Sequence, residues 1–388
     1  MRERPRPPSM FAFLRRLDYL QLGAMILLLA VGLVFIRSTG LQVDSEESRA
    51  FYGKQWMWIA IGSAAYILFS ALDYRSLICR FAVFSGYLGT VILLVVVLFA
   101  GLRIFGATRW LNVAGFRLQP SEPAKLMVIC VIAAIFSAPG MKERTFFALF
   151  LAGAVTAVPF LLIAVEPDLG SALVLLPVSA AMFFCFGIKW RWVLLGAAAI
   201  SAGIAFLVMD SVREEPLLLR NYQRDRIKVF LNPGMDRGNR GHNAYQARLA
   251  VGAGGVSGTG IGRGVQNELG FLPHTVSNND FIFSVIAEET GFVGTAGLLI
   301  LYGILLYSIL RTAFLASGYG RYIAVGVAAL IFCHVFINIG MSVGIAPVTG
   351  LPLPLVSYGG SFTLTSMITM AIIQSVYRHL GTPEEGEL

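Results

Sequence analysis

The sequence predicts an all-α polytopic membrane protein with about ten transmembrane helices and a large extracytoplasmic loop between helices 7 and 8. Two observations carry this prediction. Hydrophobic residues make up 56% of the 388 residues against 13% charged, and the mean hydropathy is +0.73, which is far more apolar than a soluble domain. The apolar residues also gather into separate runs of about 20, the length that a helix needs to cross a bilayer.

Ten such runs follow one another along the chain. They lie near residues 18–36, 55–72, 81–101, 122–137, 145–164, 169–187, 192–209, 281–308, 322–340 and 361–379. We expect residues 18–380 to form a single membrane domain that includes the loop 210–280. A basic N-terminus at 1–17 precedes this domain, and a tail at 381–388 follows it.

The charges predict how the domain is oriented. Five arginines precede the first run, and an excess of basic residues marks the cytoplasmic side. Ten crossings return the chain to its starting side, so both ends should be cytoplasmic. The segment 102–125 then lies outside, yet it carries four basic residues against one acid, Glu122. This excess indicates either an anionic ligand or anionic lipid headgroups.

A block rich in Gly and Pro separates the last two runs. It spans Asn338–Ser361 and reads NIGMSVGIAPVTGLPLPLVSYGGS. Broken backbone inside a bilayer is costly unless protein or water satisfies its polar groups, so we expect the block to shape a cavity. It offers no obvious acid or base. Ser357, Tyr358 and the nearby glycines should bring backbone close to a substrate or to the long loop.

Three acids stand near the start of the eighth run. Asp280 lies where the long loop ends, and Asp is both a good helix cap and, when ionised at the membrane boundary, a general base. The residues alone leave both interpretations open. Glu288 and Glu289 lie deeper in the same run, where buried acids are candidates for function.

Further charged residues cluster around the fourth run. Glu122 and Lys125 are three apart, so they can pair on one helix face. The alternative is a ligand site in which Lys125 and Arg109 bind phosphate oxygens. Asp168, in the turn EPDLG, is expected to cap a helix. The glycine cluster Gly252–Gly264 lacks the spacing of a nucleotide-binding loop and predicts a mobile loop or backbone that approaches a ligand.

Several blocks together resemble the SEDS family of bacterial cell-shape and division proteins, from the first run to about His379. The blocks are GATRWLNVAGFRLQPSEPAK, EPDLGS, YQRDRIKVFLNP, GHNAYQARLAVGAGGVSGTGIG, FLPHTVSNNDFIFSVIAEETGFVG and NIGMSVGIAPVTGLPLPLVSYGGS. The GLPLPLVSYGG form and the FLP…NDFIFS block favour the RodA branch over the FtsW branch. Glu166 replaces the usual Gln, Asn279 a Thr and Phe362 a Ser, and none of these changes removes the catalytic group that the family implies.

The resemblance implies a peptidoglycan glycosyltransferase of the bacterial cytoplasmic (inner) membrane whose active site faces the extracytoplasmic side. It would transfer the growing undecaprenyl-pyrophosphate-linked glycan onto the GlcNAc 4-hydroxyl of lipid II and release undecaprenyl pyrophosphate, serving cell elongation and shape. The implied partners are a class B penicillin-binding protein, other elongation-complex proteins and membrane lipids, without nucleic acid. A divalent cation, Mg²⁺ or Mn²⁺, is compatible with the family, and no residue is assigned to bind it.

The resemblance also assigns roles to residues. Asp280 inherits the catalytic position, and Arg109, Glu122 and Lys125 are implied around a central cavity that faces outward. Because the departing pyrophosphate needs cations nearby, we add two loop arginines to the predicted substrate-binding set. Two residues of the Gly and Pro block join this set because they should bring backbone close to the substrate. The four residues are Arg220, Arg224, Ser357 and Tyr358.

Two other functions fit part of the same pattern. A lipid II flippase or transporter would use the same cavity and charges, although the sequence shows no internal repeat of the kind that transporter folds often contain. A non-catalytic scaffold of the elongation complex would need neither the cavity nor Asp280.

Overall fold

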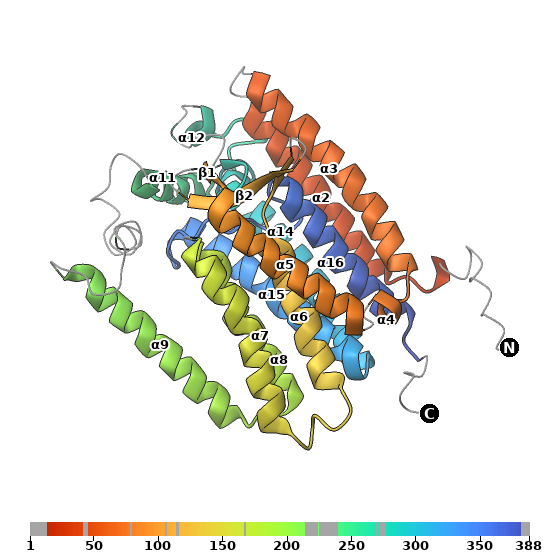
Figure 1. The fold of residues 1–388 in the computed structure, drawn as a ribbon. Helices are drawn as coiled ribbons and strands as arrows, with labels where there is room; N and C mark the ends of the chain where they lie inside the picture. The colour runs from red at the N-terminus through yellow and green to blue at the C-terminus, as the bar shows by residue number, and fades with distance from the viewer. Residues whose placement is uncertain are drawn as a thin grey trace.

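The computed structural model describes residues 14–41, 46–77, 80–104, 107–113, 116–166, 168–213, 224, 240–268, 271 and 277–381. Within these ranges the chain forms ten long helices, and each coincides with one of the ten predicted runs (Figure 1). They are α2 (Tyr19–Leu41), α3 (Glu46–Ala71), α5 (Arg80–Ala100), α6 (Ser121–Ser137), α7 (Thr145–Val165), α8 (Leu169–Phe186), α9 (Trp190–Val212), α14 (Ile282–Leu315), α15 (Gly318–Val343) and α16 (Gly360–Arg378). The predicted helical architecture is confirmed.

Seven of these helices are long and apolar enough to cross a membrane, and the chain is a multi-pass membrane protein. The other three are α3, α6 and α16. Helix α6 has only 17 residues, while α3 begins with the polar sequence EESRAFYGKQ and α16 contains several Thr, Ser and Gln residues. Helix α16 packs extensively along α3, and the buried Gln55 of α3 donates to the Thr363 hydroxyl of α16.

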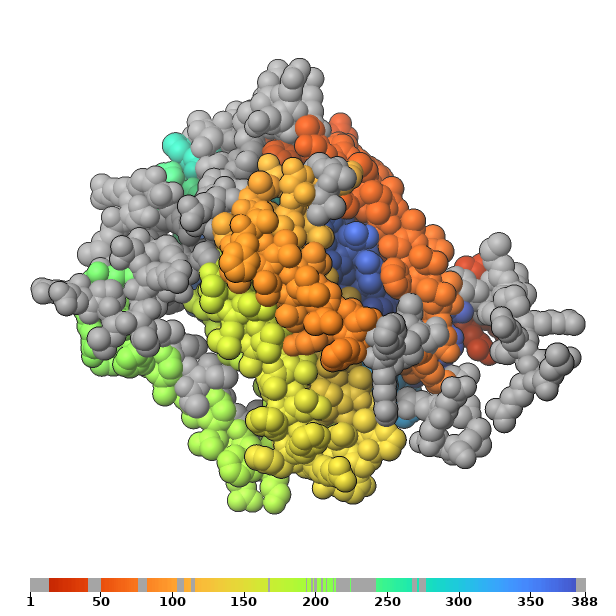
Figure 2. All heavy atoms as spheres, viewed as in Figure 1, coloured from red at the N-terminus to blue at the C-terminus, as the bar shows by residue number. Residues whose placement is uncertain are grey.

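Helix α9 stands apart from the other helices. None of the side chains described in its apolar window is buried, whereas 67% of the corresponding window of α15 is buried. Figure 2 shows open space between α9, in green, and the neighbouring α7 in this view. Only the end of α9 is enclosed, where Asp210 and Ser211 are buried. The side of the bundle beside α9 is therefore loosely covered.

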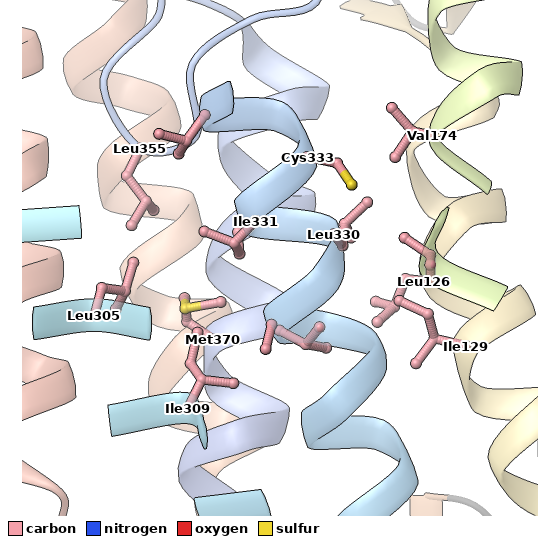
Figure 3. Packing of buried hydrophobic residues seen from close by; sticks show 14 of the residues in the cluster. Leu126, Ile129, Val174, Leu305, Ile309, Leu330, Ile331, Cys333, Leu355 and Met370 are labelled. Atoms are coloured by element: carbon pink, nitrogen blue, oxygen red, sulfur yellow. The ribbon is translucent and has the colours of Figure 1, made fainter. Parts of the chain in front are cut away.

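Helix α15 forms the centre of the hydrophobic core. Figure 3 shows Leu330 and Cys333 on one face of α15, turned toward Leu126 and Ile129 of α6 and toward Val174 of α8. On another face of α15, Ile331 lies toward α14 and α16. Since α15 is covered on both sides, its position is set by packing, and its polar residues are held in fixed places.

The segment that follows α5 contains strands that the sequence analysis did not predict. Three short strands, β1 (Leu102–Ile104), β2 (Ala107–Val113) and β3 (Phe116–Leu118), form an antiparallel sheet in the order β1-β2-β3. Strand β2 is the centre of this sheet, with Leu102 opposite Trp110 and Val113 opposite Phe116. The sheet gives Arg109 a rigid position at the end of the bundle.

The Gly and Pro block is shorter in the structure than predicted. Helix α15 continues to Val343, so only residues 344–359 are non-helical. Most residues from Leu351 to Ser357 are buried, and side chains of α14 and α15 donate hydrogen bonds to their carbonyl oxygens. The pairs are Asn338 with Leu351, His334 with Pro352 and Tyr302 with Pro354, at 2.7, 3.2 and 2.6 Å. Protein groups thus satisfy this broken backbone, as the membrane setting requires.

The glycine cluster packs against a second break, within α14. Gly291 has φ 64° and ψ −159°, which interrupts the helix, and the loop that follows α11 (Arg240–Ala253) docks there. Backbone amides and carbonyls of the loop and of the break bond one another. The pairs are Thr259 N with Glu288 O, Gly260 N with Glu289 O, Phe292 N with Gly255 O and Val293 N with Val256 O, at 2.9–3.2 Å. The mobile-loop prediction is therefore wrong.

Candidate functional site

Asp280 lies in a turn that is held by the Gly and Pro block. The turn comprises residues 278–281, and Asp280 itself is partly buried. The Ser357 hydroxyl donates to the carbonyl of Asn279 at 2.6 Å, and the amide of Tyr358 donates to the carbonyl of Asn278 at 2.9 Å. Ser357 and Tyr358 therefore position the turn, and their direct contact with substrate stays a prediction.

Asp280 does not occupy the capping position of α14. The helix begins at Ile282 with Phe281 as its N-cap, so Asp280 stands one residue before the cap. The capping interpretation of Asp280 is wrong. Its carboxylate lies beside the Gly and Pro block instead. A Cβ atom at Gly350 would be only 3.3 Å from Asp280 Oδ2.

Asn338 ties the turn to the same block from the side of α15. Its amide nitrogen donates to the carbonyl of Asp280 at 2.9 Å and to that of Leu351 at 2.7 Å. Asn338 is fully buried, so the loss of either hydrogen bond would cost free energy. Three residues from α15 and the block, Asn338, Ser357 and Tyr358, therefore fix the backbone on which Asp280 stands.

Glu122 and Lys125 form a buried ion pair at the start of α6. Lys125 Nζ lies 2.9 Å from Glu122 Oε1, and the two side chains are 1% and 4% exposed. Lys125 Nζ also lies 3.0 Å from Nε2 of His334. The predicted pairing is confirmed. His334 was not predicted, although it is a polar residue within an apolar run, four positions before Asn338 on the same helix.

Arg109 forms a second ion pair beside the first. Its guanidinium lies 3.5 Å from Asp168 Oδ1, and Gln119 donates to the other carboxylate oxygen of Asp168 at 3.2 Å. Asp168 also accepts from the amide of Ser171 and caps α8 as predicted. The Arg109 side chain is 17% exposed, which makes it more accessible than Lys125.

Glu166 is buried within this second group. The pKa of Glu166 is raised to about 8, mainly by burial and in part by the neighbouring Asp168, while Arg109 acts in the opposite direction. The carboxyl group is therefore largely protonated at neutral pH. In that form it can both donate and accept hydrogen bonds, as the amide of a Gln can.

These groups meet around the Gly and Pro block. A Cβ atom at Gly170 would lie 2.9 Å from the Thr349 side chain, so the start of α8 packs directly on the residue before Gly350. On the other side, the backbone amide of Gln119 donates to the Ser361 hydroxyl at 3.3 Å. The structure thus brings Asp280, the Glu122–Lys125 pair and the Arg109–Asp168 pair to one end of the bundle, around residues 344–361.

Comparison with known proteins decides the family. Residues 19–381 match the family described as cell cycle protein, FtsW/RodA/SpoVE. The chain belongs to this family. It is the SEDS family that the sequence blocks indicated, and the match covers the whole bundle.

Relatives of this SEDS chain carry names that agree. The peptidoglycan glycosyltransferase MrdB of Escherichia coli strain K12 is 38% identical over 76% of this chain and 77% of its own length. The peptidoglycan glycosyltransferase RodA of Treponema pallidum is 31% identical over 92% of this chain and 97% of its own length. A solved structure described as a peptidoglycan synthase complex that coordinates polymerization and crosslinking has a TM-score of 0.78, with 27% identity, and covers 95% of this chain and 99% of that chain.

The two loop arginines of the SEDS chain remain untested as ligands. Arg220 lies outside the described residues. Arg224 donates from Nε to the carbonyl of Ser211 at 2.9 Å and also bonds the carbonyl of Arg213. These contacts place Arg224 at the end of α9 rather than on the turn of Asp280, so its binding to substrate stays a prediction.

The two deeper glutamates hold the glycine loop. Glu289 accepts the Ser38 hydroxyl of α2 at 2.6 and 2.7 Å, and Glu288 accepts the backbone amide of Gln266 at 2.9 Å. The amide of Gly262 in turn donates to Ser38 at 3.0 Å. These buried acids therefore join α14, α2 and the loop in the SEDS chain, which is a structural use of their charge.

The described residues around Asp280 offer few ligands for a metal ion. Across the described ranges, no three His, Cys, Asp or Glu side chains lie close enough together to hold one. Glu122 and Asp168 are also engaged by Lys125 and Arg109. These residues do not build a metal centre by themselves, and a divalent cation stays an untested expectation.

Proposed function

We infer that the chain is a peptidoglycan glycosyltransferase of the RodA type, which polymerises lipid II into glycan strands for cell elongation. One observation carries the assignment of the site. A single carboxylate, that of Asp280, stands on a turn fixed by three buried or partly buried polar residues and lies at the same end of the bundle as two ion pairs. Such an arrangement offers a base and preorganised cations together.

The proposed reaction is a single displacement. Asp280 takes the proton of the GlcNAc 4-hydroxyl of lipid II as that oxygen bonds to the anomeric carbon of MurNAc at the end of the growing strand. The bond from that carbon to the lipid pyrophosphate breaks, and its electron pair leaves with the pyrophosphate. The α-linked donor thereby gives a β-linked product, with inversion.

The two cations have different parts in this proposal. Arg109 is the more exposed of the two, so it is the group that can contact the departing pyrophosphate directly. Lys125 is almost fully buried, and its charge acts on the developing anion through the low-dielectric interior. Glu122 keeps the Lys125 ammonium in place.

The orientation and the partner belong to the same proposal. The basic N-terminus and the even number of crossings support an active site on the extracytoplasmic side, where lipid II would be used. A class B penicillin-binding protein would cross-link the product strands. The likeness to a solved complex that joins polymerization with crosslinking supports this partner.

The test is polymerisation of labelled lipid II by the purified full chain, with and without a class B penicillin-binding protein. Asp280→Asn keeps the size of the side chain and removes the base, so we expect a loss of at least about 100-fold. Glu143→Gln is the control, because Glu143 is exposed in the turn between α6 and α7 and should retain full activity. An active, folded Asp280→Asn variant would overturn the assignment of Asp280.

The same preparation separates the alternatives. Leaflet exchange of labelled lipid II in vesicles without polymer would indicate a flippase. A preparation with neither activity whose Asp280→Asn variant still supports glycan synthesis in cells would indicate a scaffold.

A further inference from the structure

The imidazole of His334 is held from both sides in one protonation state. Lys125 Nζ lies 3.0 Å from its Nε2, and an ammonium group can only donate, so Nε2 must accept. Its Nδ1 lies 3.2 Å from the carbonyl oxygen of Pro352, and a carbonyl can only accept, so Nδ1 carries the proton. His334 is therefore a neutral ring that accepts from Lys125 and donates to the Gly and Pro block.

This contact links Lys125 to the backbone that holds Asp280. His334 and Asn338 are four residues apart on α15 and lie on the same face. They bind successive carbonyls of the block, those of Pro352 and Leu351. Asn338 binds the carbonyl of Asp280 as well. Hydrogen bonds on either side of the Leu351–Pro352 backbone thus connect the Lys125 ammonium to the turn of Asp280.

The surroundings of His334 make this link rigid. Its ring stacks on that of Phe362, with the centroids 5.4 Å apart and the planes at 29°, and the side chain is 2% exposed. A cavity of about 20 Å³, enough for one water molecule, adjoins His334 and Glu122 between α6, α15 and α16. Loss of the imidazole nitrogens would remove the contact of Lys125 with His334 and leave the ion pair with Glu122.

We propose that His334 is a positioning residue that fixes the distance between the Lys125 ammonium and the turn of Asp280. This inference rests on the proposed function, because it assigns His334 to the same transfer reaction. His334 touches neither sugar nor pyrophosphate. His334 holds the Lys125 ammonium at a fixed distance from the turn of Asp280. Its loss therefore lowers the rate of transfer more than it weakens the binding of lipid II.

Two substitutions separate the hydrogen bonds from the shape of the ring. His334→Gln places an amide oxygen toward Lys125 and an amide N–H toward Pro352. His334→Phe keeps a flat ring against Phe362 and removes both hydrogen bonds. In the lipid II polymerisation assay, we expect His334→Phe to lower kcat at least about 10-fold with KM changed less than about threefold. We expect His334→Gln to stay within about threefold of the original chain.

The matched control is His379→Phe, because His379 lies after α16 and its ring bonds the carbonyl of Ser375, away from the site. It should keep its kcat. A purely structural role for His334 would lower the yield of folded His334→Phe protein and leave the kcat of the folded fraction unchanged. That result, or equal losses in His334→Gln and His334→Phe, would overturn the proposal.

A double-mutant cycle keeps the inference distinct from the proposed function. The melting temperatures of Lys125→Met, His334→Phe and the double variant report the contact without any activity. We expect the double variant to melt no lower than the less stable single variant. Additive losses would overturn the contact between Lys125 and His334. An inactive original chain with a non-additive cycle would overturn the proposed function and, with it, the part of His334 in transfer.

Discussion

Residues 344–359 and Gly291 both interrupt helical backbone near Asp280, and different groups complete the two breaks. Around residues 344–359, side chains of Tyr302, His334 and Asn338 bond the free carbonyls. Around Gly291, backbone groups of the glycine loop form the hydrogen bonds. The first break can be altered one hydrogen bond at a time, whereas the second depends on a close backbone approach that only glycine permits.

The largest effect is expected from a methyl group between the two backbones at the Gly291 break. A Cβ atom at Gly254 would lie 1.9 Å from the carbonyl oxygen of Ala287, and neither chain can move easily. Gly254→Ala should lower the free energy of unfolding by about 4 kcal/mol or more, at the upper end for single substitutions. Thermal unfolding of the detergent-solubilised chain measures it.

Gly252→Ala is the matched control, two residues earlier. A Cβ atom there meets nothing within 4 Å, and Gly252 lies within α11, where Ala is favoured over Gly by about 0.5–1 kcal/mol. Equal stability of the two variants would show that the loop and α14 are not in backbone contact.

A smaller loss is expected at the side-chain break from Asn338→Leu. This substitution leaves the carbonyls of Asp280 and Leu351 without their donor, which should cost about 3 kcal/mol and lower polymerisation with it. Ser342→Ala is the control, because Ser342 bonds only the carbonyl of Asn338 within α15. If Asn338→Leu polymerises lipid II at the original rate, the block does not position Asp280.

The stability of the chain should also depend on pH through Glu166, near the start of α8. Folding raises the pKa of this carboxyl group from 4.5 to about 8. Between these values the folded chain holds a proton that the unfolded chain has released, so stability falls as pH rises. Glu166→Gln should remove about 2 kcal/mol of this decline between pH 6 and 8. Melting curves of both chains across that range check it, and parallel curves would contradict the prediction.

The smallest effect is expected from Tyr302→Phe. It deletes one hydrogen bond, from the Tyr302 hydroxyl to the carbonyl of Pro354, and should cost about 1 kcal/mol with a measurable loss of activity. Tyr319→Phe deletes a similar bond, to the carbonyl of Cys130, away from the block. It should destabilise the chain to a similar degree and leave kcat unchanged in the polymerisation assay. Equal kcat values for the two variants would show that the hydrogen bond to Pro354 does not help to position Asp280.

The two breaks also differ in how far the sequence revealed them. The Gly and Pro residues of the first break are visible in the sequence, and they predicted non-helical backbone between the last two helices. The second depends on one glycine, Gly291, inside an apolar run, and nothing local shows which distant segment will dock there. The ten helices were predictable because bilayer thickness fixes their length.

The polar residues of the site were predictable to a different extent. The Glu122–Lys125 pair follows from helix spacing, and the cap at Asp168 from its turn. Two of the three strands, β1 and β3, have only three residues each, which is too short to show an alternating pattern. The contact of Arg109 with Asp168 joins strand β2 to the N-cap of α8, two elements far apart in the sequence, and His334 resembles a core residue until the fold places Lys125 beside it.

The docking of the glycine loop on α14 also limits how this chain can change over generations. Four backbone hydrogen bonds fix residues 255–260 in register with residues 288–293. An inserted or deleted residue between Gly254 and Gly264 would shift that register and place side chains where only hydrogen atoms fit. The length of this segment should therefore be inherited unchanged, whereas the exposed turn around Glu143 is free to lengthen or shorten as sequences diverge.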